Sequence, residues 1–273
     1  MHSVANKLFD MTTSSPAKFL NYKRYDLNES DATILERGGW LTSDVLNFGF
    51  ACLCKKDGRL DHDQYAFLNP LTIMMITHGD SETVASIVED CQLLSKELIF
   101  IPLNDASATS SLNRGTHWRL LVFSKKSKSF HLYDSSSSNS FNVGETDLGR
   151  QGNFLVERLA PFLVNSTKSV DSFAAVELSS YTTAVESCPQ QENGYDCGMY
   201  VFCLVDLMCS AFSKNDHGLH SPHDLADVVK KNITPSYVTQ KRIELYQEAI
   251  RLRGIWQKQL QTSATKAKTI TKK

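Results

Sequence analysis

Cys197 lies where a polar, glycine-containing turn meets an apolar run. From this residue onward, apolar side chains recur with the i, i+3, i+4, i+7 spacing of a buried helix, at positions 197, 200, 201, 204, 205 and 208. Asp196 is a suitable N-cap, so the thiol is predicted to lie in the first helical turn. Free backbone N–H groups and the positive end of the helix dipole favour a thiolate there, which is one way to build a nucleophile.

A second group of candidate residues lies on two runs rich in β-formers, residues 115–123 and 128–134. The polar tetrapeptide 124–127 between them predicts a β-hairpin with a four-residue loop. If Phe123 pairs with Lys128, His117 lies directly opposite Asp134. A carboxylate in that position would orient the imidazole and stabilise its protonated form. Taken alone, the hairpin favours a simpler interpretation, in which His117 is a strand-end histidine with an incidental acidic neighbour.

Together with a glutamine, these residues supply every group that a thiol acyl-transfer site needs. Cys197 would attack a carbonyl, His117 would take and return the proton, and Asp134 would orient the imidazole. Gln191, six residues before the cysteine, could direct its amide at the developing oxyanion alongside the Cys197 N–H. Its neighbour Gln190 competes for that role.

Three blocks of the chain, residues 115–118, 134–135 and 191–198, resemble the ubiquitin-like-protein-specific cysteine proteases, the Ulp or sentrin-specific group. Within that group the resemblance is to the deneddylase branch. It extends over residues 20–258 and includes the pair Trp40-Leu41 and residues 233–235. It implies a papain-like α+β fold of the Ulp type, with a central mixed sheet flanked by helices. It also implies cleavage after the C-terminal Gly-Gly of a small modifier.

The resemblance assigns roles residue by residue. His117, Asp134 and Cys197 correspond to the catalytic triad of the family, and Gln191 to its oxyanion-hole residue. This agrees with the chemistry that the residue types and their order in the chain indicate.

By the same resemblance, Trp40 and Trp118 enclose the Gly-Gly tail of the modifier. Only a glycine backbone passes easily between closely spaced aromatic faces. Core packing is the alternative for either indole, and Trp118 is favoured as the substrate contact because it adjoins His117. The family often places a modifier-binding acid after its Trp-Leu pair. Here Asp44 stands one position late, a rotation of about 100° on a helix.

Length and composition restrict the class of protein. At 273 residues with 41% hydrophobic content, the chain is long enough for a substantial core. A formal net charge of −1 argues against nucleic-acid binding, and no apolar run approaches the roughly 20 residues that span a bilayer. A signal-peptide core is not expected near the N-terminus. We expect a flexible arm at 1–19, a protease domain at 20–258 and a disordered basic tail at 259–273.

The seven cysteines form an odd set without the paired spacing of a zinc site. Without an export signal they are expected to be reduced thiols of the cytoplasm or nucleus. The thiol chemistry proposed for Cys197 requires neither a metal nor an organic cofactor.

The sequence therefore predicts a monomeric thiol protease that removes a Nedd-type modifier from lysine conjugates, cullins among the candidates, and processes the modifier precursor. Three alternatives stay open. The first is a SUMO-specific protease of the same family. The second is an acyltransferase that uses the same residues, and the third is a non-catalytic module that binds a modifier.

Overall fold

The computed structural model describes residues 17–22, 25–53, 64–105, 115, 117–136, 147–164, 183–213 and 226–270. The strands are β1 (Lys18–Tyr22), β2 (Tyr25–Asn28), β3 (Tyr65–Phe67), β4 (Leu98–Asn104), β5 (Trp118–Ser124), β6 (Ser129–Tyr133) and β7 (Thr183–Val185). The helices are α1 (Glu29–Arg37), α2 (Ser43–Leu53), α3 (Pro70–His78), α4 (Ser81–Asp90), the 3-10 turn η1 (Leu93–Ser95), α5 (Asp147–Leu163), α6 (Cys197–Ser213), α7 (Ala226–Asn232) and α8 (Pro235–Ile270).

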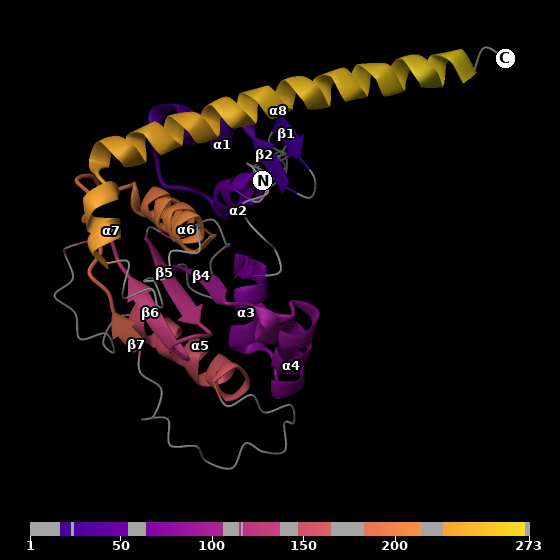
Figure 1. Ribbon diagram of the computed structural model, residues 1–273. Helices are drawn as coiled ribbons and strands as arrows, with labels where there is room; N and C mark the ends of the chain where they lie inside the picture. Colours follow the sequence, from indigo (N-terminus) through magenta and orange to yellow (C-terminus); the bar gives the residue numbers. More distant parts are fainter. Residues whose placement is uncertain are drawn as a thin grey trace, which may run out of the picture.

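A five-stranded mixed sheet in the order β3-β4-β5-β6-β7 forms the centre of the molecule (Figure 1). The inner pairs β4-β5 and β5-β6 are antiparallel, and the outer pairs β3-β4 and β6-β7 are parallel. This is the α+β arrangement with a mixed sheet that the sequence predicts, and the prediction is confirmed.

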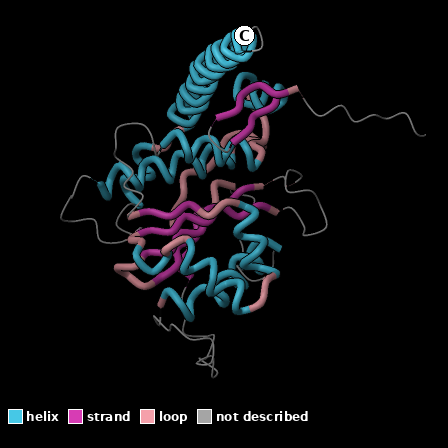
Figure 2. The backbone as a smooth tube through the Cα atoms, turned by 90° about the vertical axis from the view of Figure 1, so that its right-hand side faces the viewer, coloured by secondary structure: helices cyan, strands magenta, loops and turns pink. Residues whose placement is uncertain are grey.

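Helices cover both faces of the sheet, as Figure 2 shows. Alternate residues of β5 enter different cores: Leu120 and Val122 join the core that contains α2, α6 and α8, whereas Leu121 and Phe123 join the core that contains α3, α4 and α5. Since both faces are buried, the strand can be a nearly continuous apolar run. The charged Arg119 is the exception within it, and it belongs to the site described below.

The chain ends differ from the predicted boundaries. The sequence predicts a disordered tail from residue 259, but α8 continues to Ile270 and extends beyond the rest of the molecule (Figure 1). Residues 255–270 contain neither glycine nor proline and are rich in Gln, Lys and Ala, which favour a helix. Strand β1 begins at Lys18, inside the predicted arm, while residues 1–16 and 271–273 lie outside the described residues. Within the described ranges, every helix is too short or too polar to cross a membrane.

Candidate active site

Helix α6 begins at Cys197, as the apolar spacing predicts, and the cysteine is buried. The turn before it is held by Asn193, whose Oδ1 accepts from the N–H groups of Tyr195 at 3.0 Å and Asp196 at 2.9 Å. The Asp196 carbonyl accepts the first helical hydrogen bond, from the Tyr200 N–H at 2.9 Å. The thiol therefore lies in the first turn, where the helix has N–H groups without intrahelical acceptors.

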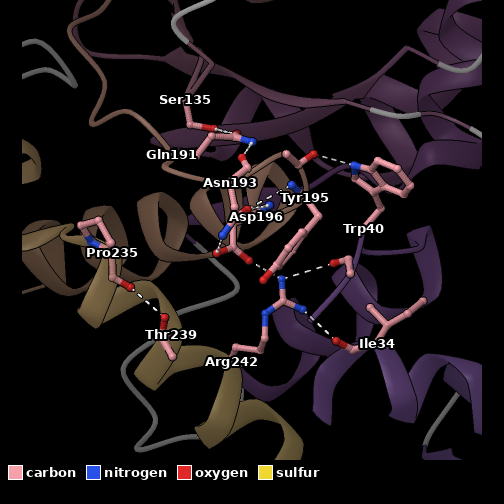
Figure 3. Close-up of polar contacts among 12 residues, drawn as sticks. Ile34, Trp40, Ser135, Gln191, Asn193, Tyr195, Asp196, Pro235, Thr239 and Arg242 are labelled. Atoms are coloured by element: carbon pink, nitrogen blue, oxygen red, sulfur yellow. Dashed lines mark hydrogen bonds and ion pairs between the residues drawn. The ribbon is translucent and has the colours of Figure 1, made fainter. Parts of the chain in front are cut away.

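The carboxylate of Asp196 has a different role from the capping role that the sequence predicts. Instead of accepting from the helix N–H groups, Oδ2 accepts from Asn193 Nδ2 at 2.7 Å and Oδ1 pairs with Arg242 Nη2 at 2.5 Å (Figure 3). A buried arginine draws the carboxylate away because a charge-assisted hydrogen bond is stronger than one to a neutral N–H group. The helix start is thus joined to α8.

His117 and Asp134 are brought together as the sequence predicts. His117 Nε2 lies 2.8 Å from Asp134 Oδ1, and both side chains are largely buried. The backbone of His117 is fixed by Asp105, whose carboxylate accepts from the His117 N–H at 2.9 Å and whose own N–H donates to the His117 carbonyl at 3.2 Å. With Nε2 engaged by the carboxylate, Nδ1 is left for the cysteine.

The predicted hairpin register, however, is wrong by two residues. Ser124 pairs with Ser129, so the loop comprises residues 125–128 rather than 124–127. Lys128 cannot pair with Phe123, because it adopts a left-handed φ of 52° inside the loop. A shift of two residues leaves each side chain on its own face of the sheet. Asp134 therefore remains within reach of His117, although diagonally rather than directly opposite.

The corrected register places Arg119, not His117, opposite Asp134. Arg119 Nε lies 2.6 Å from Asp134 Oδ2, and the arginine side chain is only 4% exposed. The Ser136 N–H also donates to Oδ1, at 2.9 Å. Burial raises the pKa of Asp134, but the hydrogen bonds from His117 and Ser136 and the charges of His117 and Arg119 outweigh it and lower the pKa. The carboxylate is therefore ionised at neutral pH.

His117 is shifted in the opposite direction. Burial of the ring acts to lower its pKa, but hydrogen bonds to Asp134 and Cys197, with their negative charges, raise the pKa from 6.5 to about 9. An imidazolium is thus favoured at neutral pH. It lies between the carboxylate and the thiol, which is the arrangement of an activated thiolate.

Gln191 and Gln190 differ in how their amide hydrogens are used. Gln190 Nε2 donates to two backbone carbonyls, Asp134 O at 3.1 Å and Cys188 O at 2.8 Å, so both of its N–H bonds are occupied. Gln191 Nε2 donates to Asn193 O at 2.6 Å, which within the described residues leaves one N–H available. The geometry favours Gln191 as the oxyanion donor.

The side-chain oxygen of Gln191 is held by the segment that follows β6. Ser135 Oγ donates to Gln191 Oε1 at 2.8 Å, and the Gln191 N–H donates to the Ser135 carbonyl at the same distance (Figure 3). Ser135 follows Asp134 directly, so the segment that carries the acid also orients the glutamine.

The two tryptophans lie in different surroundings. Trp118 is 2% exposed and donates its indole N–H to Leu41 O at 2.9 Å. It packs so closely on α6 that a Cβ on Gly198 would lie 3.1 Å from its ring and 2.9 Å from Leu41 Cβ. Trp40 is 53% exposed and donates to Gly194 O at 2.7 Å. Trp40 is thus the indole open to a ligand, whereas adjacency to His117 favoured Trp118 in the sequence.

Sequence reasoning missed three residues of the site: Asp105, Arg119 and Arg242. Arg119 carried a signal, because a charged residue within an otherwise apolar strand requires a buried partner. Asp105 and Arg242 carried none, since each contacts the site through folding of a distant segment.

Comparisons with known proteins identify the family of the chain. Residues 39–246 match the Ulp1 protease family, C-terminal catalytic domain. Sentrin-specific protease 8 of Homo sapiens is 30% identical over 228 residues, which cover 82% of this chain and 92% of that protein. NEDD8-specific protease 1 of Arabidopsis thaliana is 26% identical over 235 residues, 85% of this chain and 92% of that protein. A crystal structure of a de-sumoylating protease has a TM-score of 0.61 at 16% identity and covers 90% of this chain and 95% of its own. With its family model matched over more than half of its length, and with a buried cysteine at the start of α6 near a hydrogen-bonded histidine and aspartate of the hairpin, the chain belongs to the Ulp1 family of cysteine proteases.

Proposed function

We propose that this protease cleaves after the C-terminal Gly-Gly of a Nedd-type modifier, releasing it from lysine conjugates and from its precursor. The observation that carries the proposal is the imidazole of His117, bonded to Asp134 at 2.8 Å and to the thiol of Cys197 at the start of α6. The pair supplies both a nucleophile and a proton donor in one place.

In the proposed reaction, the Cys197 thiolate attacks the carbonyl carbon of the terminal glycine. The protonated His117 then gives its proton to the lysine amine as the C–N bond breaks, leaving a thioester. Water attacks the thioester, His117 accepts a proton from that water, and the modifier leaves with a free carboxylate. Asp134 keeps the imidazole oriented through both steps.

The developing oxyanion requires hydrogen-bond donors that are fixed before the reaction. Two are available: the free N–H of the Gln191 amide and the backbone N–H of Cys197 in the first turn of α6. Gln191 is held at its carbonyl oxygen by Ser135, so its amide is oriented without the substrate.

The exposed ring of Trp40 covers the proposed path of the Gly-Gly tail. Its indole N–H is bonded to Gly194 in the turn that leads to Cys197, which fixes the ring beside the nucleophile. Trp118 forms the buried side of the same region, against Leu41 and Gly198. A tail without side chains suits this aromatic surrounding.

The choice of a Nedd-type modifier rests on the relatives. NEDD8-specific protease 1 of Arabidopsis thaliana carries the modifier in its name, and sentrin-specific protease 8 matches over most of both chains. The de-sumoylating protease shares the fold at 16% identity, so a SUMO-type substrate is the second candidate. We further propose that the enzyme is a monomer of the cytoplasm or nucleus, with cullin conjugates among its substrates.

The test is release of a fluorogenic leaving group from Nedd-type, SUMO and ubiquitin C-terminal conjugates, with wild-type protein beside Cys197→Ala. We expect turnover of the Nedd-type conjugate that is abolished in the variant. Preference for SUMO would retain the chemistry and change the substrate. If no conjugate is cleaved, acetyl transfer to lysine in the presence of acetyl-CoA and plain modifier binding become the functions to measure.

A further inference from the structure

Arg242 of α8 contacts two segments near the proposed nucleophile: the turn that precedes Cys197 and the segment that precedes Trp40. Its Nη2 pairs with Asp196 Oδ1 at 2.5 Å, and the same guanidinium donates to the Ile34 carbonyl at 2.9 Å and the Gly39 carbonyl at 3.3 Å (Figure 3). It also lies 5.7 Å from the centre of the Tyr195 ring. Arg242 is 6% exposed, so these contacts are shielded from water.

Two segments that are distant in the sequence meet at this guanidinium. One is residues 34–40, which end in the exposed indole of Trp40, and the other is residues 193–196, which directly precede the nucleophile. They also contact each other: Trp40 donates to Gly194, and Gly38, at a left-handed φ of 86°, packs so closely on Tyr195 that a Cβ would lie 3.0 Å from the ring. Arg242 therefore connects the proposed tail-binding indole with the start of α6.

The charge of Arg242 has a separate consequence. Asp196 is adjacent to Cys197 and is itself buried, at 8% exposure. An uncompensated carboxylate at this position would oppose formation of the thiolate. On the hairpin side, the thiol faces His117, and His117 is followed by the ion pair of Asp134 and Arg119. On the α8 side, the charged groups are Asp196 and Arg242.

We propose that Arg242 is a positioning residue for the protease reaction: its charge neutralises Asp196, the residue before the nucleophile, and its backbone contacts to Ile34 and Gly39 hold the segment that leads to Trp40 against the nucleophile turn. The proposal rests on the proposed function in that Cys197 is the nucleophile. It predicts that the effect of the Arg242 charge on the thiol and the effect of its hydrogen bonds on the Trp40 segment can be measured separately with different substitutions.

The first experiment measures the rate of iodoacetamide alkylation of the peptide containing Cys197 against pH, by mass spectrometry. This readout requires no substrate. In Arg242→Gln we expect the midpoint of the profile to move to higher pH by about one unit, because Asp196 has lost its partner. Arg242→Lys keeps the positive charge and should leave the midpoint near that of wild type. The double variant Asp196→Asn/Arg242→Gln removes both charges and should also restore it.

The second experiment separates KM from kcat on the conjugate that wild type cleaves. Lysine cannot reach three acceptors as the planar guanidinium does. Arg242→Lys should therefore raise KM about fivefold or more with little change in kcat, by the loss of one hydrogen bond to the Trp40 segment. The double variant should show the same rise in KM. Arg251→Gln is the matched control: an arginine on the same helix, 56% exposed at its side chain and paired with Glu248, whose loss should change neither readout.

Several results would overturn the proposal. An alkylation profile of Arg242→Gln that coincides with wild type would remove the charge role, and unchanged KM in Arg242→Lys would remove the geometric role. A variant that loses thermal stability but moves neither readout would make Arg242 merely structural. If Arg242→Gln does not fold, Arg242→Lys and the double variant decide both points. Cleavage by Cys197→Ala would instead refute the proposed function, whatever Arg242 does.

Discussion

His117 and Asp134 lie 17 residues apart, at the open end of one hairpin, whereas Asp196 and Arg242 lie 46 residues apart, on the nucleophile turn and on α8. Both pairs surround the same thiol. The first depends on pairing between neighbouring strands, and its geometry follows once the hairpin forms. The second depends on the packing of α8 against α1 and α6, which no local pattern determines.

The two regions also distribute charge differently. On the hairpin side one carboxylate, Asp134, faces two cationic partners, His117 and Arg119, and its pKa is lowered. On the α8 side, among the residues that the structure describes, one carboxylate, Asp196, faces one cation, Arg242. The hairpin side should therefore tolerate loss of one partner better than the α8 side. Substitutions at the hairpin test this difference directly.

The largest effect is expected from Asp134→Asn. The neutral amide gives the imidazolium no opposite charge, and its NH2 group can donate to the ring and favour the wrong tautomer, so kcat/KM should fall by about 10³-fold or more. The variant also leaves the buried Arg119 without its carboxylate, which should lower the free energy of unfolding by about 3 kcal/mol. Steady-state kinetics and urea denaturation measure the two effects.

The double variant Asp134→Asn/Arg119→Gln is the control that separates them. Since no unpaired charge remains, most of the lost stability should return while activity stays low. Activity that returned together with stability would mean that Asp134 acts only through the fold.

Gln191→Ala is expected to have the next largest effect. Removal of one preorganised oxyanion donor typically lowers kcat by about 10²-fold. Gln190→Ala is the matched control, because both of its amide hydrogens are bonded to backbone carbonyls, and its effect on kcat should be much smaller. Equal losses in the two variants would show that the turn, rather than the free N–H of Gln191, is what the reaction requires.

Arg119→Gln should have a smaller effect on activity. Asp134 keeps its hydrogen bonds from His117 and Ser136 in this variant. We expect kcat/KM to fall about tenfold, the equivalent of one hydrogen bond to a charged group. A loss of kcat/KM as large as that of Asp134→Asn would contradict the expectation that Asp134 still functions after one of its two cationic partners is removed.

How much of this site the sequence could predict depends on the range of each contact. The start of α6 at Cys197 follows from apolar spacing, and the approach of His117 to Asp134 survives a register error of two residues because side chains alternate with a period of two. The same error concealed Arg119, whose direct partner is visible only in the true register. Arg242 could not be found in this way, since its acceptors come from two distant parts of the chain, residues 34–39 and Asp196.

The C-terminal part of helix α8 is a second feature that the sequence alone did not predict. Its last residues were expected to be disordered because they are basic and low in complexity, yet they lack helix breakers and continue the preceding helix. Composition alone does not distinguish a solvated tail from a solvated helix. What distinguishes them here is the helix already formed and packed from Pro235 onward.

The smallest effect expected is a dependence on pH that differs between the two regions. The pKa of His117 is raised on folding from 6.5 to about 9, so its protonated form contributes stability fully below pH 6.5. That contribution is lost as pH rises through about 9, and kcat/KM should fall to half near the same pH, because the imidazolium is the proton donor to the leaving amine. In Arg119→Gln the alkaline midpoint should stay within about half a unit of wild type, since the Asp134 hydrogen bond to His117 is retained. In Asp134→Asn, residual activity should fall at a lower pH, because the negative charge that raises the pKa of His117 is gone. A midpoint that stays near 9 in Asp134→Asn would assign the raised pKa to Cys197 alone, and the hairpin would then orient the imidazole without setting its charge.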